Sequence, residues 1–174
     1  MIKIMQTAID GFYSSSGIID YVTRNFNGTH GYTTDALPSG SIEYYTVTYY
    51  DDYNYPNKKN LVTADTIAGN SGKYTANVRS LVTGTKTLVL DGVTPATYLV
   101  ATIYYDDKYR PLQTERDLYD GSGGVETVSN QYDFIGQLLQ SKTKQTFNSV
   151  TTEVLTTYRY DHARLNIRLA LMLR

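Results

Sequence analysis

The sequence predicts a mainly β protein in which antiparallel β-hairpin repeats form a curved or spiralling sheet, with one short N-terminal helix. Three observations support this fold class. The 174 residues include 18 Tyr but 4 Phe and 0 Trp, and Tyr, Val and Thr favour strands because they pack on a pleated, half-buried surface. Gly, which numbers 13, separates the strand-like runs. Tyr-Asp pairs recur at a nearly constant interval in the second half.

Length and charge restrict the domain count and the partners. One domain over residues 1–174 fits the length, because a chain of this size buries about 70% of its unfolded surface. Hydrophobic residues make up 41% of the chain and the net charge is −1, with 16 basic against 17 acidic residues. No basic cluster favours nucleic acid. No run approaches the length of a membrane span, and the N-terminus lacks the usual secretory signal pattern.

The upstream segment, residues 1–60, is predicted to combine strands with the short helix. Loose alternation predicts a strand over 2–13, and clearer alternation predicts another over 42–51. A helix is predicted over 17–26 because serines precede it as N-caps, Asn-Gly follows it as a stop, and its apolar positions have helical spacing. These positions are Ile18, Tyr21, Val22 and Phe26.

The hairpin region, residues 79–174, is predicted to hold seven further strands. An exposed connection over 53–60 and an ambiguous, turn-rich stretch over 61–80 precede it, and Asp120 to Gly124 form a loop within it. The predicted strands cover 85–93, 97–107, 109–118, 125–134, 136–147, 151–162 and 163–173.

Three similar units carry the Tyr-Asp pairs: "IYYDDKYRPLQT" at 103–114, "NQYDFIGQLLQS" at 130–141 and "YRYDHARLNIRL" at 158–169. Their tyrosines, at positions 105, 132 and 160, are 27 and 28 residues apart. Tyr50 lies 55 residues before the first, close to two such steps, but no Tyr-Asp stands midway near 74–78. A fixed period in this range indicates a repeat architecture.

Each unit is interpreted as one β-hairpin. The run before Tyr-Asp is a strand, and the Asp opens a turn by accepting hydrogen bonds from backbone N–H groups about two residues on. Gly136 stands where a positive φ is expected. The run after the turn returns antiparallel, and neighbouring hairpins must pair to cover their edges.

These units resemble the YD-repeat (Rhs-type) family, whose pattern is Tyr-Asp-x-x-Gly-Arg-Leu. The stretches "NGTHGYTTDALPSGSIEYYTVTYYDDYNY" and "LVTGTKTLVL" also look like the segment upstream of the repeats in Bacteroides-type wall-associated members. The resemblance covers roughly residues 10 to 165. Tyr109 replaces the Gly of the first unit, Gln137 replaces the Arg of the second, and the last unit lacks the Gly. The matching motif residues are Tyr105, Asp106, Arg110, Tyr132, Asp133, Gly136, Tyr160, Asp161 and Arg164.

The resemblance implies a secreted or cell-surface location and a structural role. Repeats of the family build a spiralling sheet that can close into a shell, and carbohydrate binding has been proposed for them. The chain is therefore expected to be a non-catalytic wall segment. Its expected partners are cell-wall or surface carbohydrate and further copies that associate through sheet edges, with no nucleic acid and no membrane span.

Two other functions remain open. Exposed faces of Tyr45, Tyr49 and Tyr104 would form a platform for sugars, although cross-strand ladders of half-buried rings explain the same tyrosines. A hydrolase would use carboxylates such as Asp107 and Glu115, but nothing in the sequence orders these into a pocket.

No metal or cofactor site is expected. The pairs Asp51-Asp52 and Asp106-Asp107 are interpreted as turn-forming residues, because adjacent strand residues point to opposite faces and hardly converge on one ion. His30 and His162 are far apart, and 0 Cys excludes thiolate ligands and disulfides.

Overall fold

In the computed structural model the chain divides into two compact units. One comprises Met1–Tyr45 and Asn54–Pro56, and the other Thr46–Tyr53 and Asn57–Arg174. The structure describes residues 22–28, 30–34, 43–68, 70, 74–92, 95–119, 123–160 and 166–173, the last range by its backbone alone. The strand predicted over 2–13 lies outside these residues.

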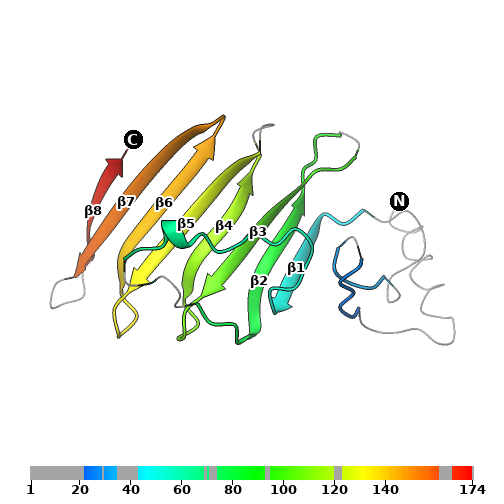
Figure 1. The fold of residues 1–174 in the computed structure, drawn as a ribbon, viewed down its shortest axis with the longest axis horizontal. Helices are drawn as coiled ribbons and strands as arrows, with labels where there is room; N and C mark the ends of the chain where they lie inside the picture. Colours follow the sequence, from blue (N-terminus) through cyan, green and yellow to red (C-terminus); the bar gives the residue numbers. More distant parts are fainter. Residues whose placement is uncertain are drawn as a thin grey trace, which may run out of the picture. The chain divides into compact units, whose positions relative to one another are not determined.

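The larger unit contains one antiparallel sheet of eight strands, which follow one another in sequence order (Figure 1). Each strand pairs with the strand before it and the strand after it, as in a meander. The mainly β, antiparallel prediction is therefore confirmed. The strands are β1 (Thr46–Asp51), β2 (Val78–Leu88), β3 (Tyr98–Tyr105), β4 (Pro111–Leu118), β5 (Gly124–Tyr132), β6 (Leu138–Phe147), β7 (Val150–Tyr160) and β8 (Asn166–Leu173).

The strand bounds differ from the sequence prediction mainly at β1 and β2. β1 begins four residues later than the predicted 42, and β2 begins at Val78, within the stretch that the sequence left ambiguous. The start of β2 depends on a long-range contact, because Asp51 Oδ1 accepts the N–H of Ser80 at 2.6 Å. Ser80 has a φ of 63°, so the strand bends there in a way that its composition does not indicate.

The helix predicted over 17–26 is wrong for its described part, residues 22–26. Arg24 pairs with Tyr32 in an antiparallel bridge, and the N–H of Thr33 donates to the carbonyl of Thr23 at 2.8 Å. The intervening Asn27-Gly28 therefore lies within a turn rather than after a helix. Paired threonines and a ring under the Arg24 guanidinium favour this local pairing over the helical spacing.

A strap formed by residues 57–68 crosses one face of the sheet from β3 to β6 (Figure 1). It includes the short 3-10 helix η1 (Thr63–Asp65). Gln113 on β4 holds the strap as a backbone partner would, since its Oε1 accepts the N–H of Val62 at 2.8 Å and its Nε2 donates to the Val62 carbonyl at 3.0 Å. The N–H of Lys59 donates to Thr102 Oγ1 at 3.0 Å.

Ion pairs fix both ends of the strap to the sheet. Lys59 pairs with Asp117 on β4. Asp65 pairs with Lys144 at 2.9 Å and lies 3.6 Å from Lys142, both on β6. Opposite charges on strap and sheet thereby set the position of the strap along β4 to β6.

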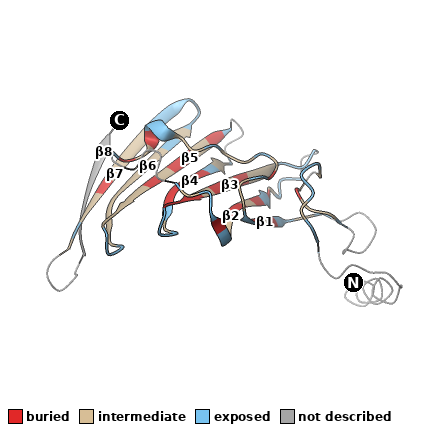
Figure 2. Cartoon of the chain, turned by 60° about the horizontal axis from the view of Figure 1, so that its bottom comes forward, coloured by how far each residue is buried: buried red, intermediate tan, exposed pale blue. Residues whose placement is uncertain are grey.

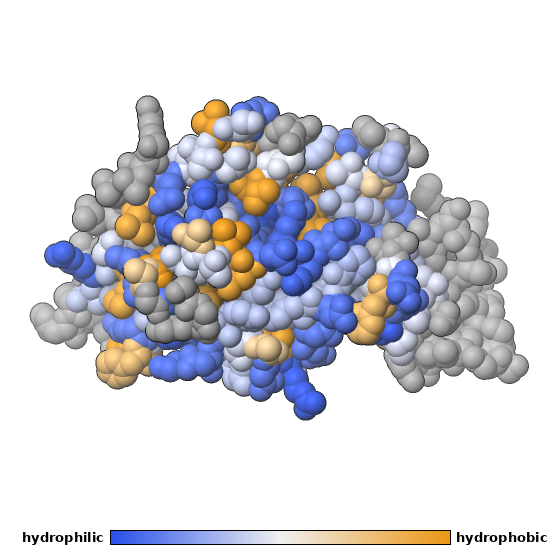
Figure 3. Space-filling view, in the orientation of Figure 1, coloured by the Kyte–Doolittle hydropathy of each residue, from blue (hydrophilic) through white to orange (hydrophobic). Residues whose placement is uncertain are grey.

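The buried residues lie mostly on β2 to β5, coloured red in Figure 2. About half of them are polar or charged, as Gln113 and its hydrogen-bond partner Ser129 show. The face that carries the strap is largely hydrophilic, with hydrophobic residues in small separate patches (Figure 3). The sheet and its strap therefore depend on hydrogen bonds and ion pairs as well as on apolar burial.

Candidate functional site

The first Tyr-Asp turn, residues 106–110, joins β3 to β4 through one carboxylate. Asp106 Oδ1 accepts the N–H of Lys108 and the N–H of Arg110, both at 2.9 Å. The Asp106 N–H donates to the Arg110 carbonyl at 3.0 Å, and its carbonyl accepts the N–H of Tyr109 at 3.1 Å. The predicted role of this Asp in opening the turn is confirmed.

The second Tyr-Asp turn, residues 133–137, joins β5 to β6 with the same bonds. Asp133 Oδ1 accepts the N–H of Ile135 at 3.0 Å and of Gln137 at 2.8 Å. Its backbone N–H donates to the Gln137 carbonyl at 2.9 Å, and its carbonyl accepts the N–H of Gly136 at 3.3 Å. Gly136 has a φ of 96°, as predicted. Tyr109, at the same place in the first turn, has a φ of 61°.

The other two Tyr-Asp positions differ. Tyr160 ends β7, but Asp161 and Arg164 lie outside the described residues, so their roles stay predictions. Asp51 ends β1 with a φ of 72° and is followed by a connection of 26 residues before β2 rather than by a tight turn. The strap belongs to this connection.

Two side chains of the first turn bind the backbone of the second. Arg110 pairs with Asp106 (Nη2 to Oδ2, 2.6 Å) and donates from Nη1 to the Asp133 carbonyl at 2.7 Å. Its guanidinium also lies over the Tyr132 ring, 4.6 Å from the centroid. Lys108 Nζ donates to the Phe134 carbonyl at 2.9 Å. Both cations therefore link successive turns.

Electrostatics favour the ionised form of Asp106. Burial by itself would raise the pKa of Asp106, but hydrogen bonds from the Arg110 side chain and from the N–H groups of Arg110 and Lys108 outweigh it, so this pKa is lowered. Burial and the Asp106 charge raise the pKa of Tyr132. The Tyr132 hydroxyl therefore stays protonated and remains a hydrogen-bond donor.

The tyrosines of the Tyr-Asp pairs connect each strand to the strand before it. Tyr132 Oη donates to the Pro111 carbonyl at 3.2 Å and Tyr160 Oη to the Leu138 carbonyl at 2.9 Å. Pro111 and Leu138 are both the fifth residue after the Asp of the preceding turn. Tyr105 Oη donates to Val82 on β2 at 2.7 Å.

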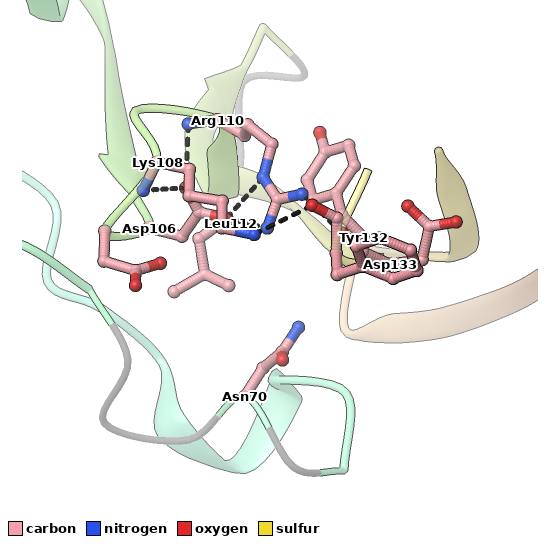
Figure 4. Close-up of a pocket in the computed structure, with 9 residues that line it drawn as sticks. Asn70, Asp106, Lys108, Arg110, Leu112, Tyr132 and Asp133 are labelled. Carbon is pink, nitrogen blue, oxygen red and sulfur yellow. Dashed lines mark hydrogen bonds and ion pairs between the residues drawn. The ribbon is translucent and has the colours of Figure 1, made fainter. Parts of the chain in front are cut away.

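A pocket of about 430 Å³ opens between the two turns (Figure 4). Asn70 approaches it from the strap side, opposite the Arg110 guanidinium and the Asp133 backbone. Its lining is formed by Asn70, Asp106, Asp107, Lys108, Arg110, Leu112, Tyr132, Asp133 and Phe134. The pocket is mixed in charge, and Phe134 beside it is 84% exposed.

The expected tyrosine platform for sugars is wrong for two of its three residues. Tyr49 is 0% exposed and Tyr104 is 3% exposed, so neither ring is open to a sugar. Tyr104 is covered because Tyr53 stacks on it at 4.8 Å between centroids and its hydroxyl donates to the Lys59 carbonyl in the strap at 2.7 Å. Tyr45 is 61% exposed.

The two carboxylates of the hydrolase hypothesis occupy different environments. Asp107 lies in the exposed first turn and lines the pocket, whereas Glu115 is buried in β4 and does not line it. Within the described ranges, no group of three or more His, Asp or Glu side chains is placed to hold a metal ion. No helix in these ranges has the length and apolarity needed to cross a membrane.

Comparison with protein-family models, curated proteins and solved structures gave no match. The geometry of the turns therefore carries the functional interpretation.

Sequence reasoning missed the roles of Lys108 and Asn70 and the existence of the strap. The strap contacts join charged and amide side chains that are far apart in the chain, such as Asp65 and Lys144. Complementary charge between distant residues is the only sequence signal for them.

Proposed function

We propose that the chain is a non-catalytic structural and interaction segment of a cell-surface or secreted YD-repeat (Rhs-like) protein. In this role its hairpins are part of a β wall that continues as a curved or spiralling sheet. The supporting observation is the bonding between successive turns, in which Arg110 and Lys108 reach the carbonyls of Asp133 and Phe134. Such bonds make the stability of one repeat depend on its neighbour, as expected of a stacked array.

Hydrogen exchange tests the coupling between repeats. Arg110→Ala removes the bond to the Asp133 carbonyl, so we expect faster exchange in both turns, 106–110 and 133–137. Gln137→Ala is the matched control because Gln137 occupies the Arg position of the second unit. A response to Arg110→Ala confined to 106–110 would show that the hairpins are independent and would remove the main support for a wall.

The location is tested separately on cells that produce the protein. Protease applied to intact cells is expected to remove the chain while a cytoplasmic marker survives. Loss of the chain only after lysis contradicts a surface location.

Glycan binding is the second candidate, now at the pocket between the turns rather than on the strand tyrosines. Asp107 and Asn70 supply acceptors there, and the exposed Phe134 ring could stack on a sugar. This candidate predicts saturable binding to a polysaccharide that Phe134→Ala abolishes and Tyr45→Ala leaves intact. The absence of binding across a broad glycan panel contradicts it.

A further inference from the structure

A lysine and an aspartate are held in contact where the strap crosses β6. Asp65 belongs to η1 in the strap, and Lys144 belongs to β6. Lys144 Nζ lies 3.0 Å from Asp65 Oδ1 and 2.9 Å from Asp65 Oδ2. Because the nitrogen contacts both oxygens, it faces the carboxyl carbon between them. Asp65 is buried, whereas the Lys144 side chain is 34% exposed, so the carboxyl carbon is the better shielded of the two reacting atoms.

A second carboxyl, that of Glu115, lies beside this pair. The sheet register places Glu115, Thr127 and Lys144 in one row across β4, β5 and β6. Glu115 is buried, and its Oε1 has no hydrogen-bond partner among the residues that the structure describes. The groups that face Glu115 are Tyr104 on β3, Thr127 on β5, Lys144 on β6, and Lys59 and Asp65 on the strap. Burial raises the pKa of Glu115, so this carboxyl holds a proton next to the ion pair.

We propose that Lys144 and Asp65 condense to an isopeptide bond that joins the strap covalently to β6, and that Glu115 moves the proton this reaction requires. The bond is a modification within one chain, so the inference goes beyond the wall role and does not rest on it. It closes a loop between two residues that are 79 positions apart. Because the chain has 0 Cys, no disulfide can fix the strap in this way.

The reaction needs no co-reactant. The Lys144 ammonium first gives a proton to the Asp65 carboxylate across their contact, which leaves an amine and a carboxylic acid. The Nζ lone pair then attacks Cγ, the Nζ–Cγ bond forms, and one Cγ–Oδ bond breaks. Glu115 gives its proton to the departing hydroxyl, which leaves as water, and takes a second proton from the nitrogen. One amide and one water replace one ammonium and one carboxylate, without oxidation or reduction.

The fold favours condensation because it holds the two groups together. Well-oriented groups within one molecule react as if present at about 10⁵–10⁸ M, so the contact offsets the competition from water. The terminal torsion of an aspartate is broad, which lets the carboxyl turn its face toward the nitrogen. The hydrogen bond with Asp65 raises the pKa of Lys144, so the ammonium form predominates at first. The initial proton transfer within the pair therefore limits the rate.

Intact-mass spectrometry of the purified full chain gives the first test. The mass is expected to be lower than the encoded mass by one water molecule. After trypsin digestion, residues 60–73 and 143–159 are expected in one branched peptide, because trypsin does not cut at an acylated lysine. An unaltered mass in a chain whose strap resists proteolysis overturns the proposal. So does a water loss that maps to an aspartyl imide at Asp91-Gly92 or Asp120-Gly121.

Arginine substitutions separate the cross-link from the ion pair. Lys144→Arg keeps a cation opposite Asp65 but offers no nucleophilic amine, so complete loss of the branched peptide is expected. Lys142→Arg is the matched control, because Lys142 Nζ lies 3.6 Å from Asp65 Oδ1, further away than Lys144. This variant is expected to keep the cross-link. A branched peptide in Lys144→Arg, or its loss in Lys142→Arg, contradicts the assignment to Lys144.

The rate of bond formation tests the role of Glu115. Chain recovered unfolded from inclusion bodies starts the reaction when it refolds, and the branched peptide is then measured over time. Glu115→Gln is expected to slow its appearance about a hundredfold, and limited proteolysis of the strap checks that the variant folds. The wild-type rate is expected to fall as pH rises through the pKa of Glu115, a step that the variant lacks. Equal rates, or the same pH profile in both proteins, overturn the role of Glu115.

Discussion

The hydroxyl of Tyr160 donates a hydrogen bond to the carbonyl of Leu138 at 2.9 Å, and this bond spans two Tyr-Asp units. Leu138 is the residue at which the chain leaves the second Tyr-Asp turn and enters β6. The same relationship joins Tyr132 to Pro111 at the start of β4. One side chain therefore fixes the end of each Tyr-Asp strand against the beginning of the strand before it.

Removing the Tyr160 hydroxyl should lower the free energy of unfolding more than removing the Tyr132 hydroxyl. Tyr160→Phe is expected to lower the free energy of unfolding by about 1 kcal/mol, the usual net value of one hydrogen bond. Tyr132→Phe should cost less, because Asn130 Nδ2 also donates to the Pro111 carbonyl at 3.1 Å. Urea denaturation measures both values. A larger loss for Tyr132→Phe contradicts the assignment of these bonds.

Substitutions at the positive-φ positions of the two Tyr-Asp turns, Tyr109 and Gly136, should change stability in opposite directions. Gly136→Ala is expected to destabilise by about 1 kcal/mol through the backbone alone, because an added Cβ would meet nothing within 4 Å. Tyr109→Gly should stabilise by up to about 1 kcal/mol, since it relieves a bulky residue with φ of 61°. Thermal unfolding of both variants provides the measurement. Destabilisation by Tyr109→Gly would mean that the Tyr109 ring contributes more than its strained backbone costs.

Acid should destabilise the first turn by protonating Asp106. The pKa of Asp106 is lowered in the folded chain, so this carboxylate contributes stability above its unfolded pKa of about 4 that is lost as pH falls. Asp106→Asn removes this dependence and lowers stability at neutral pH. Asp133→Asn is the control, as no arginine pairs with that carboxylate in the part of the chain that the structure describes. Unchanged acid unfolding in Asp106→Asn would refute the ion pair with Arg110.

Glu115 should make the sheet less stable as pH rises. Burial and the nearby Asp65 raise the pKa of Glu115, against the hydrogen bond from Thr127 and the charges of Lys59 and Lys144. The stability contributed by this group is complete below its unfolded pKa of about 4.3 and is lost as pH rises through the folded value. Glu115→Gln should therefore gain stability over the wild type as pH increases from 4 to 8. A stability difference that stays constant over this range would show that Glu115 has the same protonation in both states.

The strap should detach when Gln113 cannot bind it. Gln113→Leu leaves the N–H and carbonyl of Val62 without their partner, at a cost of about 2–3 kcal/mol. Limited proteolysis is expected to cut within 57–68 in this variant and to spare the wild type. Thr114→Ala, one residue along β4 and on its other face, is the control. Equal cleavage of all three proteins would show that the ion pairs at Lys59 and Asp65 suffice.

The amino-acid sequence by itself determined the hairpins and their turns. An aspartate that accepts two backbone N–H groups within four residues acts locally, so Asp106, Asp133 and Gly136 could be placed from spacing and turn chemistry. Alternation of apolar and polar residues likewise gave β3 to β7 to within a few residues. The helix predicted over 17–26 is wrong in its described part, 22–26, because the partner of Arg24, Tyr32, lies beyond the window in which helical spacing is judged.

The tertiary structure alone decided which strand side chains are exposed to solvent and which are covered. Lys59 meets Thr102 across 43 positions and Asp65 meets Lys144 across 79, and no local pattern encodes such a pairing. The strap these contacts hold covers Tyr104, turning an expected binding ring into part of the core. Burial depends on which distant segment covers a face, whereas turn geometry depends on bonds between near neighbours. The sequence could therefore predict the turns but not the covered face.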